Sequence, residues 1–124
     1  MKRNIAKSEL DVMSILWDRP GLAASAVHAG LSDTDTRSLQ TIKTLLSRLV
    51  DKGALQTEAE GRRYLYHPTM TRDDYAASAT RRFSDRLFGG RAAPIVAHLA
   101  EDNGLSNDDI AELEAIIREL KSRD

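Results

Sequence analysis

The chain has 124 residues and no cysteine, and its 18 Lys and Arg nearly balance its 19 Asp and Glu, for a formal net charge of -1. This length fits one domain or a small domain with an arm, and the lack of cysteine excludes disulfides, thiolate metal sites and cysteine nucleophiles. The basic N-terminal residues are not followed by an apolar run, and every later uncharged stretch is too short to cross a membrane. We therefore expect a cytoplasmic protein that does not insert into membranes.

Residues 8–31 predict two helices. Ser8 is the expected N-cap of the first, because acidic residues follow it in the first turn. An apolar stripe then recurs at helical spacing in Leu10, Met13, Leu16 and Trp17. Residues 18–21, Asp-Arg-Pro-Gly, end this helix, and a second helix is expected over residues 24–31, with Val27 and Leu31 facing inward. Residues 32–36 form a loop by composition.

Residues 38–53 predict a third helix whose two faces require different partners. Ser38 can cap its start, and Gly53 can supply a left-handed exit. The apolar side consists of Ile42, Leu45, Leu46, Leu49 and Val50. The other side and its flanks carry amide, hydroxyl and charged groups, namely Gln40, Lys43, Thr44, Ser47 and Asp51 with Thr41 and Arg48. Such groups hydrogen-bond to phosphates and base edges, which favours a DNA recognition helix, with an ordinary surface helix as the alternative.

After Gly53 the apolar period changes to two, which predicts a β-hairpin of residues 54–59 and 62–68 with its turn at residues 60–61. Three helices followed by a hairpin are typical of a winged helix. The predicted fold class is therefore mostly α, an α+β winged helix-turn-helix with a two-stranded wing. Residues 36–72 hold 7 basic and 3 acidic side chains, so Arg62 and Arg63 at the wing tip are expected to reach phosphates or a minor groove. A hairpin turn charged only for solubility is the alternative.

Three more helices are predicted: one that begins near residues 71–74 and ends at Gly89-Gly90, a short one over residues 94–100, and one that begins at Ser106. They are too few to enclose a core by themselves, so a second copy of the chain is the expected partner. Residues 1–72 are thus predicted to form a DNA-binding domain and residues 73–124 a helical dimerisation region. The expected dimerisation residues are Tyr75, Phe83, Leu87, Ile110, Leu113, Ile116, Ile117 and Leu120.

The segment Thr41-Ile42-Lys43-Thr44-Leu45-Leu46-Ser47-Arg48-Leu49, with Tyr64-Leu65-Tyr66-His67-Pro68 behind it, resembles the penicillinase repressor family of BlaI, MecI and CopY type. The resemblance covers almost the whole chain, because it also includes residues 9–17, 87–90 and 105–113. The resemblance implies a homodimeric transcriptional repressor that binds palindromic, double-stranded operator DNA. With the outer face of the third helix, it gives these expected DNA-binding residues: Ser38, Gln40, Thr41, Lys43, Thr44, Ser47, Arg48, Arg62 and Arg63.

The resemblance also suggests how repression ends. Copper-responsive members use a cysteine-rich tail, which this chain lacks. Members of the penicillinase and methicillin type, which act in antibiotic resistance, are cut by a membrane-bound sensor protease at an Asn-Phe bond. The corresponding region here has no such bond and reads Ala97, His98, Leu99 and Ala100. We expect a cut there, with release by a small-molecule signal as the alternative.

Other function classes are less well supported. The three histidines lie far apart in sequence, and there is no glycine-rich phosphate loop. We therefore expect no catalysis, no metal and no cofactor. The stronger rival is a winged-helix module that binds protein instead of DNA.

Overall fold

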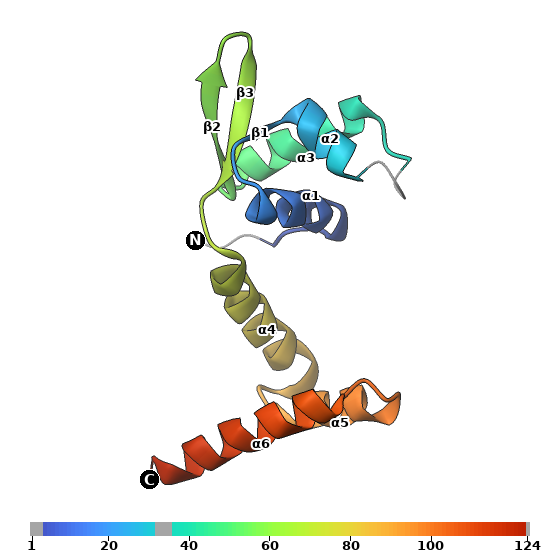
Figure 1. Cartoon of the computed structure of the whole chain (residues 1–124), viewed down its shortest axis with the longest axis vertical. Coiled ribbons are helices and arrows are strands. Elements are labelled where there is room, and N and C mark those ends of the chain that lie inside the picture. Colours follow the sequence, from blue (N-terminus) through green and yellow to red (C-terminus); the bar gives the residue numbers. More distant parts are fainter. Residues whose placement is uncertain (1–3, 32–35, 124) are drawn as a thin grey trace. The chain divides into compact units, whose positions relative to one another are not determined.

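The computed structural model describes residues 4–31 and 36–123, so most of the predicted loop 32–36 lies outside the described residues. The chain divides into two compact units, Met1–Ala76 and Ala77–Asp124. Figure 1 labels the elements, which are, in chain order, α1 (Lys7–Asp18), β1 (Leu22–Ala23), α2 (Ala24–Leu31), α3 (Leu39–Asp51), β2 (Leu55–Glu60), β3 (Arg63–Pro68), α4 (Arg72–Phe88), α5 (Ala93–Glu101) and α6 (Asn107–Ser122).

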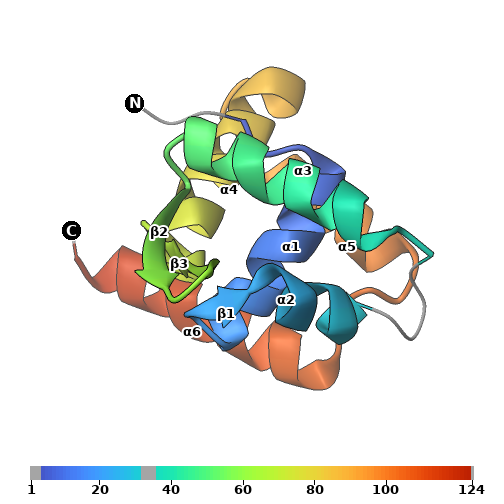
Figure 2. The same cartoon turned by 90° about the horizontal axis from the view of Figure 1, so that it is seen from above.

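The core of the first unit lies between α1, α2 and α3, the three helices that Figure 2 shows from above. The apolar stripes of the three helices meet there, and burying each such side chain contributes about 1.5 to 3 kcal/mol. The fully buried apolar side chains are Val12, Met13, Leu16, Val27, Ile42, Leu46 and Leu49. This packing confirms the inner face predicted for α3, whose outer face is left at the surface.

Both ends of α3 form as the sequence predicts. The Ser38 hydroxyl accepts a hydrogen bond from the Thr41 backbone N–H at 3.1 Å, which satisfies one of the free donors of the first turn. At the other end Gly53 has a φ of +82°, a left-handed conformation that favours glycine. The helix that carries the predicted DNA-binding residues is therefore fixed by local sequence at both ends.

The start of α1 differs from the prediction. The helix begins at Lys7 with Ala6 as its N-cap, so Ser8 lies in the first turn and is not the cap. The cause is Glu9, whose carboxylate accepts the Ala6 backbone N–H at 2.9 Å. This bond satisfies the N–H of the cap residue itself, as the glutamate of a capping box does, and it favours a helix start two residues before Ser8.

The sheet has three antiparallel strands in the order β1-β3-β2, which are the two strands of the predicted wing and one strand that was not predicted. The unpredicted strand β1 has two residues, and it pairs Leu22 with Tyr66. The hairpin turn also lies one residue later than predicted. Glu60 pairs with Arg63, which leaves Gly61 and Arg62 as the turn, and Gly61 takes a φ of +62°. The β2–β3 hairpin is the wing.

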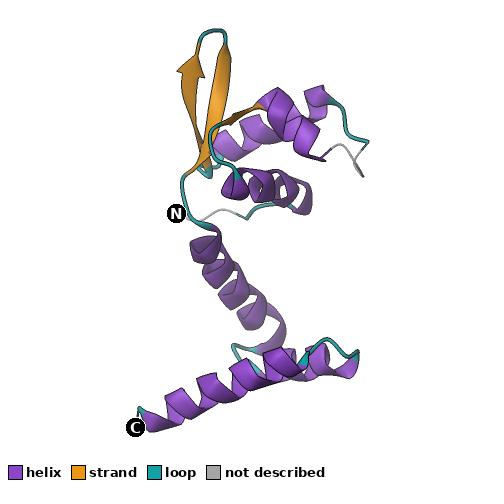
Figure 3. Cartoon of the chain, in the orientation of Figure 1, coloured by secondary structure: helices purple, strands orange, loops and turns teal. Residues whose placement is uncertain are grey.

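In the described residues of the second unit, all regular structure is helical (Figure 3). Ser106 caps α6 by accepting the Asp109 N–H at 3.0 Å, while the Asp109 carboxylate accepts the Ser106 N–H at 3.2 Å. Neither α5 nor α6 has a fully buried side chain. Among the described residues, no helix combines the length and the apolar character needed to cross a membrane.

Candidate nucleic-acid interface

All nine side chains predicted to contact DNA are exposed. Six lie on α3, one is its N-cap, and two lie at the tip of the wing. Four of the nine come together around one groove of about 390 Å³, formed by α3, the wing and the start of α2: Lys43, Ser47, Arg62 and Arg63. The other five lie outside this groove, at the start of α3 or along its surface: Ser38, Gln40, Thr41, Thr44 and Arg48.

The groove has lining residues that the sequence did not identify as site residues: Ala23, Ala24, Ser25, Leu39, Tyr64 and Tyr66. In the sequence the two tyrosines were noted only as part of the second hairpin strand and of the family-like segment 64–68. Tyr64 is 57% exposed, whereas Tyr66 packs against the core. Burial, together with the nearby Tyr64, raises the pKa of Tyr66 above 10.0, so its hydroxyl stays protonated at neutral pH and can donate a hydrogen bond.

Several hydroxyls on α3 already make local hydrogen bonds. The Ser38 and Thr41 hydroxyl oxygens are 3.1 Å apart, and Ser38 also accepts the Thr41 N–H. The Thr44 hydroxyl donates to the Gln40 carbonyl at 3.1 Å, which leaves its oxygen lone pairs available as acceptors on an exposed side chain. Ser38 thus holds the start of the helix, while Thr44 can offer an acceptor or an apolar contact to a base edge.

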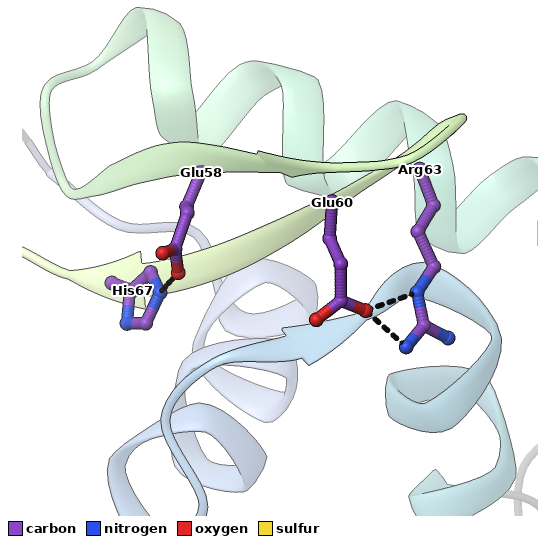
Figure 4. A network of polar contacts seen from close by, with 4 residues as sticks. All are labelled: Glu58, Glu60, Arg63 and His67. Carbon is purple, nitrogen blue, oxygen red and sulfur yellow. Dashed lines mark hydrogen bonds and ion pairs between the residues drawn. The ribbon is translucent and has the colours of Figure 1, made fainter.

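The positive charges around the groove differ in their partners. Lys43 and Arg62 make no ion pair with any residue in the described ranges. Arg63, in contrast, donates from Nε and Nη2 to the same carboxylate oxygen of Glu60, at 3.0 and 2.5 Å. Figure 4 shows this pair beside a second one on the wing, in which His67 Nε2 lies 3.0 Å from Glu58. Two of the three cations that line the groove, Lys43 and Arg62, therefore have no ion-pair partner among the described residues, and the third, Arg63, is paired with Glu60.

A partly buried ion pair links the end of α3 to the start of α1. The Lys52 ammonium lies 2.5 Å from Glu9, which is 2% exposed, and it also donates to the Asn4 carbonyl at 3.0 Å. Burial raises the pKa of Glu9. The hydrogen bonds from Lys52 and Ala6, with the charges of Lys52 and Arg48, outweigh that effect and leave this pKa below 4.5. One signal in the sequence could have indicated that Glu9 is buried: it lies at helical spacing with the apolar residues Val12, Met13 and Leu16.

The residues predicted for dimerisation lie in different environments. Tyr75 belongs to the first unit, where its ring centroid lies 5.7 Å from that of Trp17. Leu113 is half-buried beside Val96 and Leu99, which line a groove between α5 and α6 with it. The remaining six are about half exposed in the single chain: Phe83, Leu87, Ile110, Ile116, Ile117 and Leu120. The predicted cleavage region, residues 97–100, lies within α5 and is exposed.

Comparison with known proteins agrees with this architecture. The family model "Penicillinase repressor" matches residues 5–119. The penicillinase repressor of Bacillus licheniformis is 36% identical over 119 residues, which cover 96% of this chain and 93% of that protein. The solution structure of the DNA-binding domain of the repressor BlaI is 40% identical, with a TM-score of 0.53, over 60% of this chain and 94% of that one.

A second solution structure gives a similar match. It contains the monomeric form of Bacillus licheniformis BlaI in complex with the blaP half-operator, is 40% identical, and has a TM-score of 0.51 over 60% of this chain and 94% of that one. These structures confirm the winged-helix fold class predicted from the sequence. Both the family model and the curated relative extend over nearly the whole chain. The chain therefore belongs to the penicillinase repressor family.

Proposed function

We propose that this chain is a cytoplasmic transcriptional repressor that binds operator DNA through α3 and the wing. The observation that carries the proposal is the groove beside α3, where Lys43, Arg62 and Arg63 from two elements face one hollow together with Ser47. Such an arrangement of cations and hydroxyls suits a phosphate backbone. The complex of the BlaI relative with its half-operator supports the same use of the fold here.

The two sides of the interface have different tasks in this proposal. An α-helix fits the major groove of B-DNA, where the outer face of α3 would meet base edges. Gln40 can read adenine through its amide, and Thr44 can contact a thymine methyl group. Lys43 and Arg62 would neutralise phosphates, which contributes affinity with little regard to sequence. Gln40 and Thr44 on α3 thus give sequence specificity, and Lys43 and Arg62 give affinity for the phosphate backbone.

We also propose that the repressor is a homodimer with two functional regions, residues 1–72 for DNA and residues 73–124 for dimerisation. The apolar side of α6 remains exposed in the single chain, with Ile116 at 55% and Leu120 at 53%. A second copy would remove this surface from water, which is the main favourable term in association. Two-fold symmetry of the protein then matches a palindromic operator.

For derepression we propose a cut in residues 97–100 by a sensor protease. A protease needs an extended substrate, whereas these residues lie in helix α5. This nine-residue helix has no fully buried side chain, so opening it locally costs little. Release by a small-molecule signal is the rival, and the two differ in whether the intact chain persists after induction.

The proposed interface is tested by Lys43→Ala and Arg62→Ala, measured by gel shift on DNA from upstream of the chain's own gene. Each substitution removes a charged hydrogen-bond donor, so affinity should fall by about tenfold, which corresponds to about 1.4 kcal/mol. The slope of log affinity against log salt should fall by about 0.9 for each lost phosphate contact. Neither change should lower the melting temperature, because both side chains are exposed.

Lys121→Ala is the matched control, because it removes the same charge from α6 in the second unit. It should leave both the affinity and the salt slope unchanged. Normal binding by both interface variants would contradict the assigned surface. If the unmodified chain bound all DNA sequences equally or none, a protein-binding role for the winged helix would replace the proposal.

A further inference from the structure

The ion pair between Glu60 and Arg63 lies at the tip of the wing. These residues face each other across the two-residue turn, as the last pair of the β2–β3 ladder. Arg63 directs Nε and Nη2 to the same oxygen of Glu60, at 3.0 and 2.5 Å (Figure 4). Two adjacent N–H donors of a guanidinium are also the groups that bind a phosphate, where each donor meets its own oxygen. The carboxylate therefore occupies the donors that a DNA backbone would use.

The pair can be broken at low cost but still competes with DNA. The two side chains are 61% and 54% exposed, and ion pairs at such exposure contribute little to stability. However, Glu60 stays next to Arg63 even when the pair opens, and its charge then repels an approaching phosphate. The partner in the turn, Arg62, makes no ion pair with any described residue. The two arginines that line the groove thus differ in their availability to a phosphate: Arg63 is paired with Glu60, and Arg62 has no ion pair with a described residue.

We propose that Glu60 is a positioning residue that keeps Arg63 off the DNA backbone, so that the wing supplies one phosphate contact, from Arg62, instead of two. The inference rests on the proposed function and refines it. By limiting the phosphate contacts, Glu60 lowers the part of the affinity that is independent of sequence. Release of Arg63 adds a contact that the wild-type wing does not make.

The wing also provides a matched control for the charge itself. Glu58 is on the same strand, two residues before Glu60, and therefore on the same face of the sheet. Its carboxylate is paired with His67, at 3.0 Å, and not with an arginine (Figure 4). Glu58→Gln removes the same charge as Glu60→Gln from a neighbouring exposed position. It does not release a guanidinium.

The test compares the full chain with Glu60→Gln, Glu58→Gln, Arg63→Gln and the Glu60→Gln/Arg63→Gln double variant. Binding to DNA from upstream of the chain's own gene is measured between about 50 and 200 mM salt, the range over which phosphate contacts change affinity strongly. Glu60→Gln should tighten binding by about two- to fivefold, as expected for an exposed ion pair. Its salt slope should steepen by about 0.9.

The double variant separates release of Arg63 from loss of a negative charge. In the Arg63→Gln background the gain from Glu60→Gln should shrink to the effect of one lost negative charge, and the steepening of the salt slope should disappear. Glu58→Gln should likewise not steepen the slope. An equal gain with and without Arg63, or an equal steepening in Glu58→Gln, would overturn the inference and leave the proposed function intact. A wild-type chain that binds no DNA would overturn both. Equal melting temperatures of all variants show that the wing remains folded.

Discussion

Glu9 carries a charge into the interior of the first unit, where it is 2% exposed. A buried carboxylate needs partners, and this one has the Lys52 ammonium and the Ala6 backbone N–H. Lys52 is the C-cap residue of α3, so the pair ties the end of the helix proposed to face DNA to the start of α1. A residue that touches no groove thereby takes part in holding the interface in place.

Glu9→Gln should lower the free energy of unfolding by about 1 to 3 kcal/mol at pH 7, because Lys52 loses its charged partner while the amide can still accept the Ala6 N–H. The folded-state pKa of Glu9 lies below its ordinary value of 4.5. Stability from its charge is therefore fully present above pH 4.5 and is lost as the pH falls through the lower, folded-state pKa.

Urea unfolding of the two proteins from pH 7 to pH 3 measures this difference. The gap between wild type and Glu9→Gln should be constant above pH 4.5 and should narrow below it. Glu58→Gln, which changes an exposed carboxylate, is the control and should change the stability at pH 7 by less than about 0.5 kcal/mol. A gap that widens on acidification would show that the Lys52 pair does not stabilise the fold.

At the residue scale, the sequence predicted which side chains are exposed better than it predicted which side chains form ion pairs. It placed all nine candidate DNA-binding residues on the surface because helical periodicity separates apolar from polar positions. It missed the burial of Glu9, since a carboxylate is expected outside unless a partner is known. That partner is 43 residues away in sequence. It likewise gave no sign that Arg63 would be paired and Arg62 would not.

Among the elements, those fixed by local chemistry were predicted best. A serine cap and a left-handed glycine define α3, and both are visible in sequence. Strand β1 was not predicted, because two residues are too short to show alternation and the strand forms only by pairing with β3. The prediction for α1 failed at its start because the Glu9 carboxylate binds the Ala6 N–H, which makes Ala6 and not Ser8 the cap residue.

The apolar side of α6 leads to a prediction about the oligomeric state. Ile117→Asp should give monomers by sedimentation, because a carboxylate buried in an apolar seam between two chains is left without a partner. Ile117 is a better target than Leu113, since it is 51% exposed in the single chain, whereas Leu113 packs beside α5. The first unit should stay folded, with an unchanged melting transition.

Ala115→Asp is the control for this prediction. It adds the same charge to the same helix, but its position falls on the side opposite to the apolar stripe. This variant should sediment like the wild type. Dimers in Ile117→Asp, or monomers in both variants, would show that the apolar side of α6 is not the contact between two chains.

At the scale of the whole molecule, the first turn of α4 belongs to the first unit, which ends at Ala76 and so extends four residues past the proposed boundary at residue 72. Trp17 is the reason: its indole N–H donates to the Met70 carbonyl at 3.0 Å, and its ring contacts Tyr75 and the Arg72 guanidinium. Arg72 also bonds Asp18 at 3.0 Å. These contacts join residues more than 50 positions apart, which a pattern of neighbouring residues cannot reveal.

The last prediction concerns the two units acting together. If residues 73–124 hold two DNA-binding units in one dimer, the second half-site is bound intramolecularly, which raises overall affinity by about 10² to 10⁴ without any new contact. A protein of residues 1–90 should lose this gain on an operator with two half-sites. It should bind a single half-site as well as the full chain does, because the fully buried apolar side chains of the described residues all lie between Val12 and Leu49, within that fragment.

Fluorescence anisotropy with one-site and two-site DNA measures both quantities, and the single half-site is the internal control for folding of the fragment. Equal affinities of the two proteins for the two-site operator would contradict a dimer held by the second unit. They would also remove the reason for a cut in residues 97–100, because cutting could then not lower repression. If the cut is the switch, immunoblots under inducing conditions should show the intact chain disappearing as transcription rises; an intact chain at full induction would indicate release by a small molecule.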